Sequence, residues 1–312
     1  MSDVVTFTPN PALDVRSSIA RVTPDHKMRC AAAMQHPGGG GVNVARVLHR
    51  LGAQVSAVYL SGGATGERHH HLLHQEGVRS HAVPIAQETR ESFSVFETET
   101  GSDYRFVLPG PRVQAAEWQA ALAHLRQHWP KRFLVLSGGL APGMPEDLYA
   151  QLVREAKAAG VPVVIDSNGT PLSLALQAGG VALFKPSLRE LQQLTGEALA
   201  HEADIAHAAR ALIAQGRAQR VAVSLGEAGA MLVCAHEAWR AAAVPVSVQT
   251  TIGAGDSLVA GLLWAWLRQA PAIESLRWGV AASAAALLAP GTALCQSADV
   301  QRLLPEVQIR PV

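Results

Sequence analysis

The stretch Thr250-Thr251-Ile252-Gly253-Ala254-Gly255-Asp256-Ser257 joins a glycine-rich turn to an acidic residue and continues into the apolar segment 258–267. This pattern predicts a loop that enters a buried helix. Gly253 and Gly255 have no side chain, so backbone N–H groups can converge on an anion there, and the positive end of the helix dipole adds to the attraction. We therefore expect a phosphate group to bind at the start of this helix.

Asp256 is the unexpected residue of this stretch, because a carboxylate and a bound phosphate repel each other. One explanation is that Asp256 accepts a proton from a substrate hydroxyl. The other is that Asp256 only caps the helix, since aspartate is common at helix N-termini. Both interpretations fit this stretch equally well.

A second glycine-rich entrance to a helix lies near the N-terminus. Four consecutive glycines occupy positions 38–41, and residues 42–51 then show helical spacing up to Gly52. Ordering a glycine costs about 0.5–1 kcal/mol relative to alanine, so a plain connector has no need of four. Close approach of a ligand to the backbone explains this run better.

The rest of the chain alternates between strand and helix patterns. Strands are expected at 4–8, 54–60, 133–136, 161–165, 181–184, 221–225 and 230–234, and helices at 146–159, 171–178, 188–195, 203–215, 256–269 and 273–289. This alternation predicts an α/β fold with parallel pairing. Polar residues follow the strands at 137–139, 166–168, 185–187 and 224–226, and open parallel sheets bind ligands at such strand ends.

Two further segments predict a small separate sheet. Residues 93–98 and 104–107 alternate around Gly101, which indicates a hairpin. Segment 15–35 is weakly alternating and shows no helix.

Length and composition restrict the possible partners. A chain of 312 residues suits one large domain with a smaller appendage. Its formal net charge of +1 gives no reason to expect nucleic acid or an anionic membrane as partner.

Cys30, Cys234 and Cys295 are too scattered for a disulfide framework or a metal knuckle, which indicates a reducing compartment. The apolar runs at 258–267 and 280–289 are too short to span a bilayer and the N-terminus resembles no signal peptide, so we expect a soluble, cytoplasmic protein.

Other site types are less well supported. His69, His70, His71 and His74 share one expected helix, but His70 and His74 have no third ligand at suitable spacing, so solvated surface is the better interpretation than a metal site. The chain has no Gly-Lys-Ser/Thr of a P-loop. The GxGxxG pattern is incomplete, because Val44 stands at its last glycine position, which argues against a nicotinamide dehydrogenase.

The pairing of Pro-Gly-Gly-Gly-Gly-Val-Asn-Val-Ala at 37–45 with Thr-Ile-Gly-Ala-Gly-Asp at 251–256 resembles the two signatures of ribokinase-like (PfkB-type) sugar kinases. The resemblance covers essentially the whole chain. It implies one kinase domain, a three-layer α/β/α core with a mostly parallel sheet, and a small β-sheet lid formed by residues 12–36 and 90–108. It also implies ATP and Mg²⁺ as cofactors.

Within the family, 1-phosphofructokinases and tagatose-6-phosphate kinases usually carry a lysine where this chain has Gly40. Together with segments 27–30 and 62–67, the glycine run is most similar to the minor bacterial isozyme of 6-phosphofructokinase. The implied reaction is ATP-dependent phosphorylation of fructose 6-phosphate to fructose 1,6-bisphosphate. Tagatose-6-phosphate or 1-phosphofructose kinase activity is the alternative. A catalytically inactive sugar-phosphate or nucleotide sensor is a third possibility, but an intact Gly253-Ala254-Gly255-Asp256 argues against it.

The resemblance implies roles for individual residues. Asp256 would be the general base on the C1 hydroxyl, with the amides of Gly253, Ala254 and Gly255 stabilising the transferring phosphoryl group. The residues expected at the sugar are Asp14, Gly38, Gly39, Asn43 and Gly139. The 6-phosphate would be held by Arg90, Arg105 and, from a neighbouring subunit, Lys27. Arg105 alone could also be an ordinary exposed strand residue.

The nucleotide and its metal ion would bind at the second half of the chain. The residues expected at ATP are Lys185, Ser224, Gly226, Thr251, Gly253 and Gly255. Glu190 would act on Mg²⁺ through water.

Several positions depart from the family pattern. Ser187 replaces the asparagine of an Asn-x-x-Glu arrangement, which leaves magnesium handling open. Gly139 stands where relatives often present a serine to the sugar. Ala289 and Ala293 replace more polar residues near the expected monovalent-cation loop, so activation by K⁺ is left open. The apolar lid residues, such as Phe93, Val95 and Phe106, need a cover. In the family the lids of two subunits typically pack on each other, so the resemblance implies a homodimer through the lid.

Overall fold

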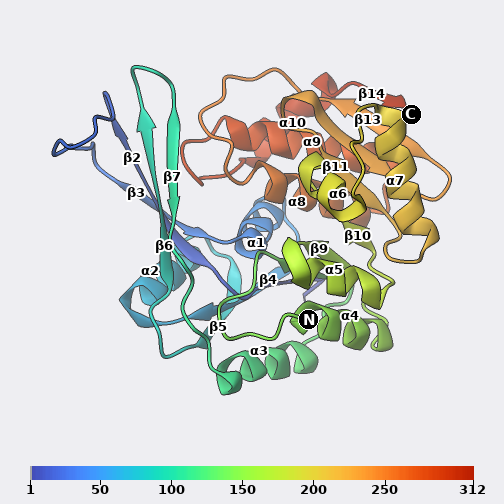
Figure 1. Cartoon of the computed structure of the whole chain (residues 1–312), viewed down its shortest axis with the longest axis horizontal. Helices are drawn as coiled ribbons and strands as arrows, with labels where there is room; N and C mark the ends of the chain where they lie inside the picture. The colour runs from blue at the N-terminus through green and yellow to red at the C-terminus, as the bar shows by residue number, and fades with distance from the viewer. Residues whose placement is uncertain (1) are drawn as a thin grey trace.

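The computed structural model describes residues 2–312 as a large central sheet between two layers of helices, with a small second sheet at one side (Figure 1). In sheet order, the large sheet consists of β14 (Ile309–Pro311), β13 (Ala238–Ala242), β12 (Gly229–Val233), β11 (Val221–Ser224), β10 (Leu183–Phe184), β9 (Val163–Asp166), β8 (Phe133–Ser137), β1 (Val4–Thr8), β4 (Val55–Ser61) and β5 (Arg79–Pro84). Neighbours from β5 to β11 pair in parallel, and the remaining pairs, from β11 to β14, are antiparallel.

Helices cover both faces of this sheet and bury two apolar cores. One core is closed by α1 (Gly40–Arg50), α8 (Ala254–Leu267), α9 (Ala272–Leu287) and α10 (Ser297–Leu303). The other is closed by α3 (Ala115–Gln127), α4 (Leu148–Ala158), α5 (Gly169–Ala178), α6 (Leu188–Thr195) and α7 (Glu202–Ala214). The predicted three-layer α/β/α fold is confirmed. No helix within residues 2–312 is long and apolar enough to cross a bilayer.

The small sheet contains, in order, β3 (Met34–Gly38), β2 (Ala12–Ile19), β6 (Arg90–Glu97) and β7 (Asp103–Val107), and it stands at the left of Figure 1. Strands β2 and β6 are parallel, whereas the other two pairs are antiparallel. Only residues 9–11 separate β1 from β2, and β3 leads through Gly39 into α1. These short connections hold the small sheet beside the carboxyl ends of the large sheet's strands.

Several elements differ from the expectations drawn from the sequence. Strands β5, β13 and β14 and helices α3 and α10 were not expected. Helix α1 begins two residues before the expected start, inside the glycine run. Helix α2 (Gly63–Gln75) carries the four histidines, but His69 is buried, so the prediction of a wholly solvated face was wrong for this residue. Two short 3₁₀ helices, Gly226–Ala228 and Leu304–Glu306, complete the structure.

Candidate active site

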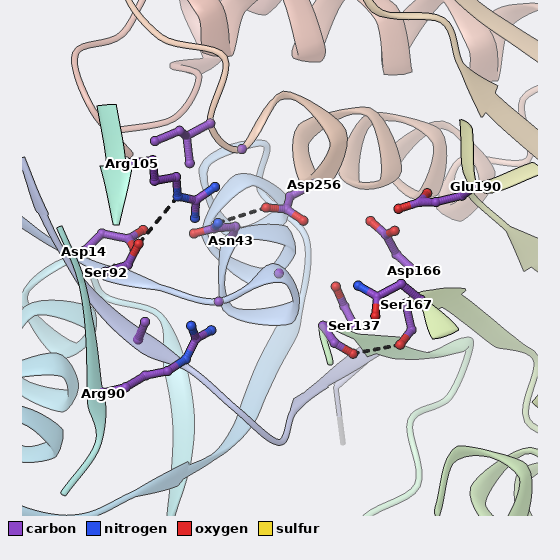
Figure 2. A pocket seen from close by; sticks show the side chains of 17 residues that line it. Asp14, Asn43, Arg90, Ser92, Arg105, Ser137, Asp166, Ser167, Glu190 and Asp256 are labelled. Atoms are coloured by element: carbon purple, nitrogen blue, oxygen red, sulfur yellow. Dashed lines mark hydrogen bonds between the residues drawn. The ribbon is translucent and has the colours of Figure 1, made fainter. Parts of the chain in front are cut away.

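A polar cavity of about 440 Å³ lies between the small sheet, the carboxyl ends of β8 and β9 and the starts of α1 and α8 (Figure 2). Eight of the residues expected at a site line it, namely Asp14, Gly39, Asn43, Arg90, Arg105, Glu190, Gly253 and Asp256. Their positions in the sequence range from 14 to 256, and the topology of the two sheets brings them together. Ser137, Asp166, Ser167 and Asn168 also line the cavity and belong to the strand ends where ligands were expected, whereas Ser92 was not anticipated.

A second cavity, of about 660 Å³, contains four of the six residues expected at ATP, and Lys185 and Gly253 do not line it. Ser224, Gly226, Thr251 and Gly255 line it, together with apolar side chains that include Val246. Such a mainly apolar wall with a few polar groups suits the base and ribose of a nucleotide.

The loop before α8 lies between the two cavities. Ile252, Gly253 and Asp256 line the first cavity, whereas Thr251, Ala254 and Gly255 line the second. Gly253 has a φ of 79°, a left-handed conformation that favours glycine, and it forms the N-cap of α8. The free N–H groups of the first helical turn therefore face the boundary between the cavities, where a phosphoryl group can bridge them.

Asp256 does not cap its helix. It makes no capping hydrogen bond, and its Oδ2 instead accepts a hydrogen bond of 2.9 Å from Asn43 Nδ2 on α1. The interpretation of Asp256 as a plain helix cap is therefore wrong. Burial, and after it the nearby Asp166 carboxylate, raise the pKa of Asp256 to about 7. A carboxylate with this pKa can accept a proton near neutral pH.

A buried arginine fixes the orientation of Asn43. Arg46 on α1 is fully buried and donates from Nη1 to Asn43 Oδ1, at 3.3 Å. Since the amide oxygen of Asn43 accepts this bond, its NH₂ group is left to face Asp256. Arg46 is itself held by Glu76, at 2.6 Å. Nothing in the sequence pattern indicated this support, because Glu76 is 30 positions from Arg46.

Lys185 supplies a positive charge beside the same loop. Its Nζ lies 3.2 Å from Asp166 Oδ1, and a Cβ placed on Gly255 would be 3.5 Å from this Nζ. Burial alone would lower the pKa of Lys185, but Asp166 and Glu190 outweigh it and raise this pKa. Lys185 is therefore cationic and close to the positions that phosphate oxygens would take.

The acidic residues near Lys185 fit a magnesium ion carried by a nucleotide. Asp166 and Glu190 both project toward the cavity (Figure 2). Mg²⁺ usually keeps several waters and binds one or two carboxylates plus substrate phosphates, so these two residues suffice. The described residues contain no cluster of three or more His, Cys, Asp or Glu side chains able to hold a metal alone. Ser187 forms a capping box with Glu190, in which each side chain accepts from the other's backbone N–H.

Two arginines line the small-sheet side of the cavity. Arg90 donates to the Asn10 and Leu108 carbonyl oxygens, at 3.2 and 3.3 Å, and its Nε is buried without a partner. Arg105 lies on an exposed strand, yet its guanidinium points into the cavity and makes a long contact of 3.5 Å with Ser92 Oγ (Figure 2). Burial raises the pKa of Asp14, and the charge of Arg105 opposes this shift. Arg90 and Arg105 therefore leave two cationic side chains available to an anionic ligand.

Three expected substrate residues do not line the cavity. Lys27 is exposed in the segment between β2 and β3. Gly38 lies against the Asp14 side chain, and any Cβ at this position would overlap the Asp14 carboxylate. Gly139 follows the cavity residue Gly138 and has open space around its Cα, so a side chain there would be tolerated.

The loop expected to hold a monovalent cation has other partners. Arg46 Nη1 donates to the Thr292 carbonyl at 2.9 Å, and Arg50 Nη1 donates to those of Ala293 and Cys295, at 2.5 and 3.1 Å. Neither Ala289 nor Ala293 has a side-chain oxygen. The carbonyl oxygens of Thr292, Ala293 and Cys295 are thus engaged by arginine side chains.

Known proteins resemble this chain over nearly its full length. A family model described as pfkB family carbohydrate kinase matches residues 12–299. A Mycobacterium tuberculosis protein named ATP-dependent 6-phosphofructokinase isozyme 2 is 42% identical over 300 residues, which cover 96% of this chain and 88% of that protein. A Xanthomonas campestris protein named 1-phosphofructokinase is 34% identical over 311 residues, with 97% and 94% covered.

Solved structures agree with this similarity. The crystal structure of phosphofructokinase-2 from Escherichia coli, described as a complex with substrates and products, has a TM-score of 0.94 and 36% identity, covering 97% of this chain and 98% of that one. A second structure of the same Escherichia coli protein, described as its tetrameric inhibited form, has a TM-score of 0.91 and 36% identity, covering 98% and 99%.

Proposed function

The chain belongs to the pfkB family of carbohydrate kinases, and we propose that the sugar it phosphorylates with ATP is fructose 6-phosphate, with fructose 1,6-bisphosphate as product. The observation that carries this proposal is the position of Asp256. Its carboxylate lies at the start of α8, next to the N–H groups that would bind phosphate, and it faces a cavity with two arginines on the opposite side. This arrangement suits a sugar with a hydroxyl at one end and a phosphate at the other.

The proposed reaction needs one proton acceptor, together with N–H and cationic groups around the transferring phosphoryl group. The C1 hydroxyl oxygen attacks the γ-phosphorus of ATP, the bond from that phosphorus to ADP breaks, and the hydroxyl proton passes to Asp256. The amides of Gly253, Ala254 and Gly255 and the ammonium of Lys185 stabilise the charge on the transferring group. Magnesium, when bound with the nucleotide, would neutralise further phosphate charge beside Asp166 and Glu190.

The remaining residues orient the two substrates. Asp14, Gly39 and Asn43 would bind sugar hydroxyls, while Arg90 and Arg105 would pair with the 6-phosphate. Guanidinium groups suit this task because they form two parallel hydrogen bonds to a phosphate. Ser224, Gly226 and Thr251 would contact ATP in the second cavity. A cytoplasmic location accords with these substrates.

Gly40 supports fructose 6-phosphate over the substrates of related kinases. A Cβ at position 40 would overlap Ser137 Oγ and lie 3.2 Å from Asp256 Oδ1. A lysine at this position, as the resemblance implies for 1-phosphofructokinases, would therefore occupy space next to the base. The 1-phosphofructokinase alternative remains the main competitor, because a relative of that name is also similar.

We further propose that the small sheet is a lid and that it joins two copies of the chain. Phe106, Val107 and Leu108 are 51–57% exposed at the β7 end of this sheet, where a partner could cover them. A homodimer of this kind would also allow Lys27 to reach the site of the neighbouring subunit.

The test of the proposed substrate is a coupled assay of ADP release with ATP and Mg²⁺. The panel contains fructose 6-phosphate, fructose 1-phosphate, tagatose 6-phosphate and unphosphorylated fructose. We expect the highest kcat/KM for fructose 6-phosphate. A higher value for fructose 1-phosphate or tagatose 6-phosphate would favour the alternative kinases. Binding of ATP and sugar phosphate without turnover of any sugar would instead support the sensor.

A further inference from the structure

Arg16 on β2 is a buried cation outside the proposed chemistry. It lies two residues beyond Asp14 and therefore on the same face of the strand. Its side chain is 8% exposed. Arg16 Nη1 forms an ion pair of 2.9 Å with Asp103 Oδ2 on β7, and its guanidinium stands over the Phe96 ring on β6, at 5.6 Å from the ring centre. The Arg16 side chain thus extends from β2 over β6 to β7, across one face of the small sheet.

The same guanidinium reaches the loop that leads into α8. Nη2 donates to the Gln249 carbonyl at 3.1 Å, and Nη1 makes a weaker contact of 3.4 Å with Thr250 Oγ1. Thr250 Oγ1 also accepts from the backbone N–H of Ile252, at 3.2 Å. Ile252 and its neighbour Gly253 line the sugar cavity. A continuous set of polar contacts therefore joins β7 of the small sheet to the phosphate-binding turn.

These contacts differ from those of an ordinary surface ion pair. Arg126 and Glu155, for example, form a bidentate pair between α3 and α4 with exposed side chains, a type that contributes little. The hydrogen bonds from Arg16 to the Asp103 carboxylate and to the Gln249 carbonyl are instead partly buried. Loss of a charge-assisted hydrogen bond is costly in such surroundings. Its two sets of partners also belong to different sheets.

We propose that Arg16 is a positioning residue that couples the placement of the small sheet over the sugar to the shape of loop 249–255. The inference rests on the proposed kinase reaction but not on which sugar phosphate is the substrate. When Arg16 is held by Asp103, its guanidinium fixes Gln249 and Thr250, and the N–H groups of the turn then point at the transferring phosphoryl group. Without this contact, ATP still binds in the second cavity, but the turn is less often in its productive shape.

The test compares Arg16→Gln with the wild type, using the sugar phosphate with the highest kcat/KM in the substrate panel. We expect kcat to fall about 10- to 100-fold, while the Kd of ATP measured without sugar stays within about twofold. Arg16→Lys should recover part of kcat, because an ammonium can still contact the Gln249 carbonyl. Arg126→Gln is the matched control and should leave kcat unchanged.

A double-mutant cycle separates coupling from damage to the fold. Asp103→Asn alone should lower kcat, and adding it to Arg16→Gln should cause little further loss, because both changes break the same connection. If Arg16→Gln does not fold, Asp103→Asn and Thr250→Val carry the test. An unchanged kcat in these variants, additive losses in the cycle, or an equal loss of ATP affinity would overturn the proposal. Lack of turnover of every sugar by the wild type would refute the proposed function instead.

Discussion

Burial raises the pKa of Asp256 to about 7, and the proposed reaction needs this carboxylate in its unprotonated form. Since protonation removes the acceptor, activity should be lost as the pH falls through this pKa. We expect kcat/KM for the sugar to be level above about pH 7.5 and to fall about tenfold per pH unit well below pH 7. A pH series of initial rates, with the protein checked for folding at each pH, measures this dependence. A level profile down to pH 5 would contradict the role of Asp256.

Arg90 offers a residue-scale test of substrate orientation. Its guanidinium lines the sugar cavity and none of the ATP cavity. We expect Arg90→Ala to raise KM for the phosphorylated sugar about 10- to 150-fold and KM for ATP far less, because a charge-assisted hydrogen bond is worth about 1.5–3 kcal/mol. Steady-state kinetics with each substrate varied in turn give both values. Arg112→Ala is a suitable control, because Arg112 lies on the exposed surface outside the cavity. Equal increases of the two KM values would argue against a phosphate contact at Arg90.

The glycine run at the entrance of α1 brings its backbone close to the Asp256 carboxylate. A Cβ at position 40 would overlap Ser137 Oγ, so any larger residue must displace the Ser137 side chain. We expect Gly40→Ala to lower kcat/KM about tenfold by displacing Ser137 toward the sugar. Ser137→Ala in the same chain should restore part of the loss, because it removes the overlapping oxygen. The kinetics of the two single variants and the double variant test this. No recovery in the double variant would mean that the new methyl group itself blocks the sugar.

The sequence predicted the elements around the site better than those at the edges of the molecule. The two glycine-rich entrances to α1 and α8 were recognisable because each joins a turn signal to a clear helical period. β13 was missed because Ala-Trp-Arg-Ala-Ala has weak strand propensity, and its pairing with β12 and β14 decides its conformation. β14 contains three residues, too few for a pattern.

The sequence likewise predicted some residues of the candidate site and missed others. Asp256 and Asn43 lie in recognisable glycine-rich motifs, whereas Arg90 was named from the resemblance alone, and all three line the cavity. Arg16 and Arg46 carried no signal, because their partners at 249, 250 and 292 are more than 230 positions away in sequence. Only the fold brings these charges to the site. The polar residues at 166–168 were recognised as a strand end, but the ion pair of Asp166 with Lys185 needed the structure.

The whole molecule exposes an apolar end of the small sheet, and this exposure predicts self-association. Phe106 is 55% exposed and stacks on Phe93 of the neighbouring strand. We expect the wild type to be a homodimer and Phe106→Asp to favour the monomer, because the new charge would be buried at the interface. Light scattering over a dilution series, run beside the kinase assay, should show activity lost with the dimer.

An exposed apolar residue far from the small sheet provides the control. Val312→Asp changes a residue that is 37% exposed and follows β14, at the opposite edge of the large sheet, and it should leave both assembly and activity unchanged. A fully active Phe106→Asp monomer would show that one chain suffices for the site. A tetramer that separates into active dimers would be consistent with the proposed interface.

The measurement that tests the central claim most directly is single-turnover phosphorylation of fructose 6-phosphate by Asp256→Asn. The substitution keeps the shape of the side chain but removes the proton acceptor. We predict that the rate of phosphoryl transfer falls roughly 10²- to 10⁴-fold, while ATP and sugar phosphate bind within a few-fold of the wild-type affinities. A rate close to that of the wild type would contradict the account, because Asp256 would then be no more than a structural residue at the start of α8.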